Sequence, residues 1–408
     1  MKALQFDVTI PKYLFTKAIG TMNRSLYYSS PFSCLQLKEV EKPALPNEEW
    51  VEVQVKYGGI CGSDLNLIYL KDSPSTSPFV SFPFTVGHEL VGMISKVGKK
   101  VDDLKIGQRV IIDPLLACEA RGITPKCNEC QAGRYNLCQH MNNGILSPGL
   151  LTGTCTDTGG SWSRYVVAHK SQIISLPDCI DDQNGVLIEP FSCALHAVLQ
   201  NKPTQNDTVL VIGAGVIGLC VVAAIRALNI DCKIITLVKH SFQGDLATYF
   251  GSNEVIFLSR QNGYIHEAAK LFNGEVLHPI IGQPIVSGGA DIIFECVGNK
   301  RSLYDSLRFA RKGGKVVLIG LASFVDKLDM TMIWLNELEI KGSFAYGTNY
   351  FESHMQKTLQ IAVELLKQSK IDLSPLITHQ FSLDEYREAL STAGNKTKQQ
   401  ALKVVFEP

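Results

Sequence analysis

The sequence predicts an α/β protein of two domains, one built on a doubly wound parallel sheet and the other mainly β. Three observations predict this class. The chain has 408 residues, which is long for a single hydrophobic core. Short apolar alternations joined by glycine-containing turns occupy residues 82–113, as expected of consecutive strands. From residue 201 onward, buried strands alternate with helices, the pattern of a parallel sheet with right-handed crossovers.

Composition and charge exclude several classes of function. The apolar share is 45%, the charged share is 19% and the formal net charge is +0, so nucleic acid is not expected as a partner. Twelve cysteines are too sparse for a disulfide scaffold. The N-terminus does not have the pattern of a signal peptide, and the apolar run 209–225 is shorter than the roughly 20 residues of a membrane span. These features predict a soluble, cytoplasmic protein without a membrane partner.

The N-terminal region carries few signals. A strand-like alternation opens the chain, at Leu4, Phe6, Val8 and Ile10. Residues 12–33 show no clear period, and we treat them as an insertion of unknown role. Residues 50–60 alternate again as a strand, and residues 71–82 are rich in Ser and Pro, which predicts a surface loop.

The strand at residues 50–60 leads into the first candidate site. Cys61, His88 and Glu89 offer a thiol, an imidazole and a carboxylate, the ligand types that Zn²⁺ accepts. Three protein ligands leave one coordination position open, as in a catalytic zinc site. Taken singly, a buried cysteine is more often a small apolar residue and a lone histidine more often structural. Together, in the segments GGICGSD and GHE, the three residues predict a metal centre.

These segments, with the continuation GHELVGMISKVGKKV, resemble the zinc-dependent medium-chain dehydrogenase/reductase family, in its alcohol, polyol and threonine dehydrogenase branch. The resemblance extends from about residue 50 to residue 408. It implies a GroES-like catalytic domain formed by residues 1–200 and 346–408, and a Rossmann dinucleotide-binding domain over residues 201–345. It also implies a homodimer or a homotetramer.

The resemblance assigns further roles near the metal. Ser63 matches the residue that relays the proton of the substrate hydroxyl, and Asp64 matches an acid that supports the metal-bound histidine. Glu189 matches a residue close to the zinc, which either binds the ion or contacts its water. The plainer alternatives are a turn serine, a helix N-cap aspartate and a capping or hinge glutamate. Asn66 stands where many relatives have a histidine, which leaves the last step of proton release open.

A second cluster of cysteines predicts a structural zinc lobe over residues 118–138. The expected ligands are four thiolates, from Cys118, Cys127, Cys130 and Cys138. In the family the first cysteine precedes the second by three residues, whereas here eight residues separate the two. The alternatives are a cluster of thiols without metal, or zinc held by three cysteines and another ligand such as Glu119.

The cofactor site begins at a glycine-rich turn. Gly213, Gly215 and Gly218 follow an apolar strand and open a helix, the context in which this triplet binds a dinucleotide. The first glycine allows a tight turn, the second lets the pyrophosphate approach, and the third packs the helix on the strand. Val216 and Ile217 stand at the helix N-terminus, whose N–H groups face the phosphates.

The end of the next strand predicts which dinucleotide binds. An NAD enzyme places an acid about 20 residues past the third glycine, and this chain has Val238, Lys239 and His240 there. No acid repels a 2′-phosphate, so we expect NADP(H) in preference to NAD(H). Asp245, a few residues downstream, leaves NAD(H) open. By resemblance, two later loops contact the ribose and the nicotinamide: Cys296, Val297 and Gly298, and Ile319, Gly320 and Leu321.

An open zinc site and a nicotinamide site in one chain predict hydride transfer between an alcohol, secondary or polyol, and its ketone or aldehyde. Two rivals remain: a zinc-free quinone or enoyl reductase of the same superfamily, and a non-enzymatic protein that binds NADPH or zinc. The sequence does not select among small-molecule substrates.

Overall fold

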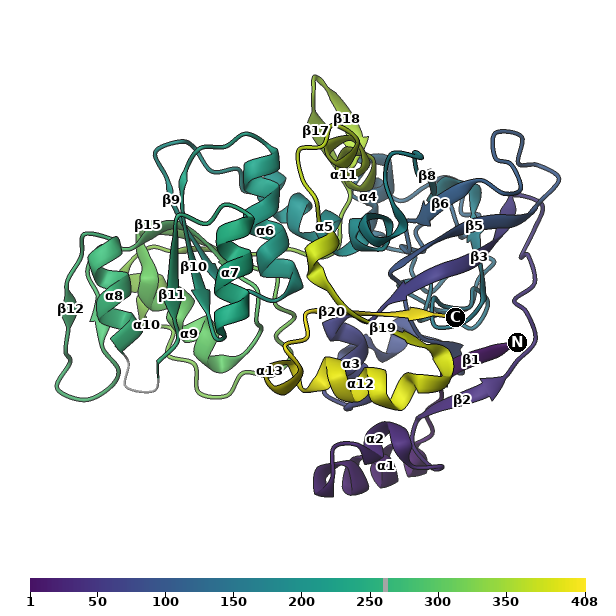
Figure 1. Cartoon of the computed structure of the whole chain (residues 1–408), viewed down its shortest axis with the longest axis horizontal. Helices are drawn as coiled ribbons and strands as arrows, with labels where there is room; N and C mark the ends of the chain where they lie inside the picture. Colours follow the sequence, from purple (N-terminus) through teal and green to yellow (C-terminus); the bar gives the residue numbers. More distant parts are fainter. Residues whose placement is uncertain (260–262) are drawn as a thin grey trace. The chain divides into compact units, whose positions relative to one another are not determined.

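The computed structural model describes residues 1–259 and 263–408 (Figure 1). The chain divides into two compact units, which we call the first and the second. The first comprises Met1–Glu189 and Tyr346–Pro408, and the second comprises Pro190–Ala345. The earlier junction lies inside helix α5 (Asp182–Gln200), whereas the sequence places the domain boundary at the end of that helix.

The first unit contains a mainly antiparallel sheet, with the order β19-β20-β3-β5-β6-β8 and with β7 also paired to β3. Its strands are β3 (Trp50–Gly59), β5 (Leu90–Val97), β6 (Arg109–Ile112), β7 (Tyr165–His169), β8 (Ile173–Ser175), β19 (Ile377–Ser382) and β20 (Lys403–Glu407). The C-terminal strand β20 lies antiparallel to β3, with Val405 opposite Gly59. The last strand therefore returns to the first unit, as the sequence predicts.

Smaller elements complete this unit. A second sheet has the order β2-β1-β4, and a hairpin is formed by β17 and β18. Their bounds are β1 (Lys2–Phe6), β2 (Leu35–Glu39), β4 (Phe84–Thr85), β17 (Thr348–Phe351) and β18 (His354–Lys357). The helices, besides the start of α5, are α1 (Ile10–Met22), α2 (Leu26–Ser29), α3 (Gly62–Ile68), α4 (Asn128–Gln131), α11 (Thr358–Lys367), α12 (Tyr386–Gly394) and α13 (Lys396–Gln399).

The expected N-terminal strand is wrong in its second half. The strand β1 ends at Phe6, and Ile10 is the first residue of helix α1. The side chain of Thr9 accepts a hydrogen bond from Lys12 N, and Pro11 stands in the first turn, where its missing N–H costs nothing. These local capping signals outweigh the apolar alternation.

The second unit is a parallel sheet with the order β11-β10-β9-β14-β15-β16, and its helices connect successive strands (Figure 1). The strands are β9 (Thr208–Ile212), β10 (Lys233–Val238), β11 (Glu254–Phe257), β14 (Ala290–Glu295), β15 (Ala310–Leu318) and β16 (Glu339–Gly342). The helices are α6 (Val216–Ala227), α7 (Ser241–Tyr249), α8 (Gly263–Leu271), α9 (Lys300–Phe309) and α10 (Thr331–Leu335), and the minor strands are β12 (Val276–Leu277) and β13 (Ile285–Val286).

The core of this sheet is mainly apolar, which is why its strands read as nearly continuous hydrophobic runs. The run at residues 209–225 is the buried strand, turn and helix that the sequence predicts, formed by β9 and α6. Within the described residues, no helix is both long and apolar enough to cross a bilayer.

Candidate active site and metal centres

Three predicted ligands meet where two strands of the first unit adjoin. Cys61 follows β3 and caps helix α3, whereas His88 and Glu89 directly precede β5. The strands are antiparallel with Gly58 opposite Leu90, so the residues just beyond them are neighbours. The ligand atoms of Cys61, His88 and Glu89 all lie within 4.8 Å of one another. The structure therefore brings together a mixed sulfur, nitrogen and oxygen donor set suited to zinc.

Asp64 organises two of these ligands. Its Oδ2 accepts a hydrogen bond of 2.8 Å from Cys61 N, and its Oδ1 lies 3.4 Å from His88 Nδ1. Asp64 therefore supports His88, and it stands at the third position of the helix rather than at the N-cap. Burial lowers the pKa of His88, but the Asp64 carboxylate outweighs it and raises the pKa overall. With Nδ1 engaged, Nε2 is the ring atom left for a metal.

Glu89 has a partner that the sequence does not reveal. The Nζ of Lys403, in β20, lies 2.6 Å from Glu89 Oε1 and 2.5 Å from Oε2, and both residues are buried. A carboxylate has more acceptor sites than one ammonium group uses, so Glu89 retains capacity for a metal. Gly59 makes this packing possible, because a Cβ there would stand 1.9 Å from Glu89 Oε2. The one sequence signal was a lysine inside an apolar strand, since buried lysines need partners.

Glu189 and Ser63 lie outside the three-residue group. Glu189 is buried and accepts a hydrogen bond of 3.1 Å from the hydroxyl of Tyr346. Burial raises the pKa of Glu189 to about 7; Glu89 also raises it, whereas His88 lowers it. Ser63 stands partly exposed in the first turn of α3. Metal contact by Glu189 and proton relay by Ser63 remain predictions.

Trp162 belongs to the core beside this site. It is fully buried, and its Nε1 donates a hydrogen bond of 2.9 Å to Gly59 O. Its ring contacts Phe406 edge to face, with the centroids 5.2 Å apart. Trp162 thus supports the backbone that admits Glu89.

The second candidate centre is the cysteine cluster. The sulfur atoms of four cysteines lie within 4.8 Å of one another: Cys118, Cys127, Cys130 and Cys138. Cys118 Sγ is 3.5 Å from Cys138 Sγ, close to the separation of about 3.8 Å that a tetrahedral Zn–S₄ site requires. A hydrogen bond from Cys130 lowers the pKa of Cys138 to about 5, although burial opposes the shift. Glu119 instead pairs with Lys126 Nζ at 2.5 Å, which favours four thiolates over three and Glu119.

Arg121 holds the loop that returns Cys118 to this cluster. The residue is fully buried, and among the described residues its guanidinium donates to backbone carbonyls. The acceptors are the oxygens of Leu116, Asn143, Leu146, Ser147 and Gly149. A planar fork with five N–H groups suits this role. Sequence reasoning missed Arg121, because an arginine in a polar loop is usually exposed.

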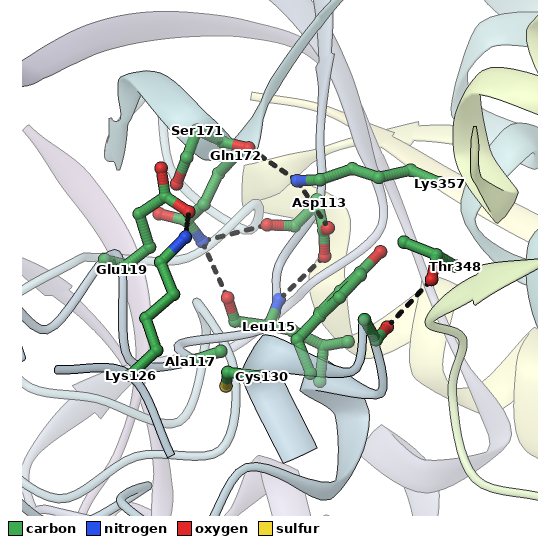
Figure 2. Close-up of a pocket in the computed structure, with 13 residues that line it drawn as sticks. Asp113, Leu115, Ala117, Glu119, Lys126, Cys130, Ser171, Gln172, Thr348 and Lys357 are labelled. Atoms are coloured by element: carbon green, nitrogen blue, oxygen red, sulfur yellow. Dashed lines mark hydrogen bonds and ion pairs between the residues drawn. The ribbon is translucent and has the colours of Figure 1, made fainter. Parts of the chain in front are cut away.

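A cavity of about 190 Å³ lies beside the cluster, and Cys130 forms part of its wall (Figure 2). The Nζ of Lys357 donates a hydrogen bond of 2.6 Å to Ser171 O and lies 3.4 Å from Asp113 Oδ2. Gln172 Nε2 donates to Asp113 O at 2.8 Å (Figure 2). The polar groups of this cavity satisfy one another, so its walls serve to join the hairpin β17–β18 to the lobe.

The glycine turn of the second unit has the geometry that the three roles require. Gly213 has φ +95°, which an L side chain rarely adopts. Gly215 caps helix α6, and a Cβ there would meet nothing within 4 Å, which leaves space for a ligand. A Cβ on Gly218 would stand 1.8 Å from Gly213 O, so only glycine allows this packing. Val216 and Ile217 form the first turn of α6.

The end of β10 adjoins this turn. Gly213 N donates a hydrogen bond of 2.9 Å to Leu237 O, and Val238 is the last residue of the strand. Lys239 is exposed, and His240 caps helix α7. Asp245 lies within α7 and is exposed, so it does not occupy the strand end.

The two later loops lie against each other and against the glycine turn. Glu295 Oε1 accepts hydrogen bonds from Val297 N at 2.9 Å and from Gly298 N at 2.8 Å. A Cβ on Gly298 would overlap Gly320 O, and a Cβ on Gly213 would stand 2.3 Å from Val297 Cγ2. Cys296, Ile319 and Leu321 flank these positions. The residues predicted to contact the cofactor thus gather at one end of the parallel sheet.

Comparison with known proteins agrees with this geometry. Residues 47–178 match the alcohol dehydrogenase GroES-like domain, and residues 216–364 match the zinc-binding dehydrogenase model. The L-idonate 5-dehydrogenase of Vitis vinifera is 30% identical over 359 residues, which cover 87% of this chain and 87% of that protein. The chain belongs to the zinc-dependent medium-chain dehydrogenase/reductase family.

Other members of this family are similarly close. The sorbitol dehydrogenase of Bacillus subtilis (strain 168) is 29% identical over 376 residues, or 91% of this chain and 95% of that protein. Among solved structures, a putative zinc-binding dehydrogenase from Sinorhizobium meliloti 1021 bound to NADP has a TM-score of 0.71 and 25% identity, and covers 100% of both chains. The predicted fold class, a Rossmann domain with a GroES-like domain, is confirmed.

Proposed function

We propose that this protein is a zinc-dependent dehydrogenase that interconverts a polyol or another secondary alcohol with its ketone, using NADP(H) in preference to NAD(H). Two relatives of nearly full length act on polyhydroxylated substrates by name, sorbitol and L-idonate. The observation that carries the proposal is the convergence of Cys61, His88 and Glu89 within 4.8 Å.

The chain's own residues divide the work. Cys61, His88 and Glu89 would hold the zinc, and Asp64 keeps the imidazole of His88 oriented. Bound zinc supplies Lewis acidity, which lowers the pKa of an alcohol hydroxyl and polarises a carbonyl. Ser63, two residues after Cys61, accepts the hydroxyl proton. Glu189, whose carboxyl has a pKa of about 7, is suited to hold or release a proton near neutral pH.

The second zinc would be structural. Four cysteine sulfurs close the coordination shell of the lobe and leave no position for substrate. The preference for NADP(H) rests on the end of β10, where no acid follows Val238 and where Lys239 is an exposed cation. A 2′-phosphate would meet attraction there rather than repulsion.

A panel of polyols and simple secondary alcohols, assayed with both cofactors on protein of known zinc content, tests the function. We expect turnover that disappears when the mixed-ligand zinc is removed and returns when zinc is restored. Turnover that survives zinc removal would instead support a quinone or enoyl reductase. Cofactor binding without turnover of any substrate would support a non-enzymatic role.

A further inference from the structure

Helix α1 exposes its apolar face to solvent, whereas a helix that packs on a protein core buries that face. Ile10, Leu14, Phe15 and Met22 are 78%, 61%, 46% and 84% exposed. At about 100° per residue they fall within an arc of about 140° on one side of the helix, and Pro11 and Ala18 lie inside the same arc. An amphipathic surface helix normally turns this face inward.

The orientation is set by small residues on the opposite side. Thr16 and Gly20 are the buried residues of α1. A Cβ on Gly20 would stand 2.4 Å from the ring of Tyr27, so the helix rests directly on α2. The hydroxyl of Thr16 donates to Phe32 O at 3.4 Å. The helix cannot turn its apolar side inward without losing this close packing.

Phe32 extends the exposed surface beyond the helix. Its ring is 66% exposed and contacts Phe15 edge to face, with the centroids 5.8 Å apart. We call Ile10, Leu14, Phe15, Met22 and Phe32 the apolar stripe. Figure 1 shows α1 and α2, in purple, at the outer edge of the first unit beside α12. Contiguous exposed apolar surface of this kind marks an interaction site.

The segment that carries the stripe is cationic between its two terminal acids, Asp7 and Glu39. Between Asp7 and Glu39 the charged residues are Lys12, Lys17, Arg24 and Lys38. Lys17 lies about 20° beyond Ile10 on one border, and Lys12 lies about 60° beyond Phe15 on the other. Lys12 also pairs with Asp7 at 3.2 Å. A lysine therefore stands on each border of the stripe: Lys17 is exposed, and Lys12 shares its charge with Asp7.

We propose that α1 docks its apolar stripe on a lipid bilayer that carries anionic headgroups. A helix with phenylalanine and leucine on one side and flanking lysines lies in the plane of such an interface. The 13 residues of α1 extend over about 20 Å, too short to span a membrane but sufficient to lie on one. A second copy of the chain fits less well, because its cationic border would face the same cationic border. That no helix of the described residues could cross a bilayer is compatible with binding to its surface.

Flotation of the full-length protein with phosphatidylcholine vesicles, with and without phosphatidylserine, tests the proposal. We expect binding to the vesicles that contain phosphatidylserine, weakened by added salt. Leu14→Glu should reduce the partition coefficient by about tenfold or more, because a charge replaces an apolar side chain buried in the interface. Lys17→Gln should reduce it by about fivefold.

A matched control is Ile281→Glu, at a residue of the second unit that is 90% exposed and distant in sequence from the stripe. It should float like the unaltered protein, and Leu14→Glu should keep its dehydrogenase activity in the absence of vesicles. The proposal is overturned if the protein does not float, or if Leu14→Glu floats as well as the control. It is also overturned if Leu14→Glu changes only the oligomeric state in ultracentrifugation, which would assign the stripe to a second copy.

Discussion

The two candidate metal centres lie in the same unit but differ in their surroundings. The mixed centre has three different ligands, and one of them, Glu89, is held by a buried lysine. The sulfur centre has four equivalent ligands, and its loop is tethered through Arg121 to backbone carbonyls. A buried cation therefore stands near each centre. Lys403 contacts a predicted metal ligand, whereas Arg121 bonds to the backbone of the loop.

The surroundings suit the mixed centre for catalysis and the sulfur centre for stabilising the fold. Glu89 has Lys403 as a second partner besides a metal. A zinc with three protein ligands keeps one coordination position open for substrate. Four thiolates would fill the coordination shell of the zinc and leave no position for substrate or water. We therefore expect substitutions at the mixed centre to change turnover and those at the sulfur centre to change stability.

The largest effect should come from the two cysteine substitutions taken as a pair. Cys61→Ser should lower kcat by about 10³-fold or more, because the Lewis acid contributes several kcal/mol to the reaction. Its denaturation midpoint should change little. Cys127→Ser should instead lower the midpoint and release the other zinc, since metal binding at a structural site is coupled to folding. Steady-state kinetics, zinc analysis and urea denaturation check both, and equal effects on turnover and stability would remove the distinction.

Lys403→Met should destabilise the zinc-stripped protein by about 3–5 kcal/mol, because Glu89 is left as a buried, unpaired carboxylate. Adding Glu89→Gln should recover most of that loss. Urea denaturation provides the measurement. The control is Lys2→Met, which breaks the exposed pair of Lys2 with Asp384 and should leave the midpoint unchanged. Equal effects of Lys403→Met and Lys2→Met would show that burial of the pair does not matter.

Arg121→Met should cost about 3 kcal/mol of stability, since buried carbonyls lose their donor. It should also speed the release of the lobe zinc to a chelator, because the loop that carries Cys118 loosens. Arg134→Met is the control in the same lobe, where Arg134 forms an exposed pair with Glu129. Chelation kinetics and denaturation compare the two, and an unchanged release rate in Arg121→Met would argue against the tether.

The smallest effect should come from the cofactor turn of the second unit. Lys239→Ala should raise the Kd for NADPH by about tenfold through loss of a charge-assisted contact to the 2′-phosphate, and should leave the Kd for NADH unchanged. Lys312→Ala, another exposed lysine of this unit, should change neither. Fluorescence titration measures both constants, and tighter binding of NADH by the unaltered protein would refute the cofactor preference.

The parts predicted best are those whose signals lie close together in the sequence. The glycine turn was predicted with its three separate roles, because strand, turn and helix follow one another between residues 208 and 227. The strand predicted at Ile10 is wrong for a local reason too, since Thr9 caps helix α1 at that point. The spacing of Cys118 departs from the family pattern, and its return to the cluster depends on contacts such as those of Arg121, which the spacing does not reveal.

Residue types and local spacing predicted the donor sets of both centres and the turn for a dinucleotide, and the resemblance carried by these motifs predicted the family. The tertiary structure alone decided that Lys403 meets Glu89, 314 residues away along the chain, and that α1 turns its apolar side outward. The physical reason is range: caps, turns and ligand motifs act over a few residues, whereas such pairings depend on strand register and on which surfaces remain to be covered.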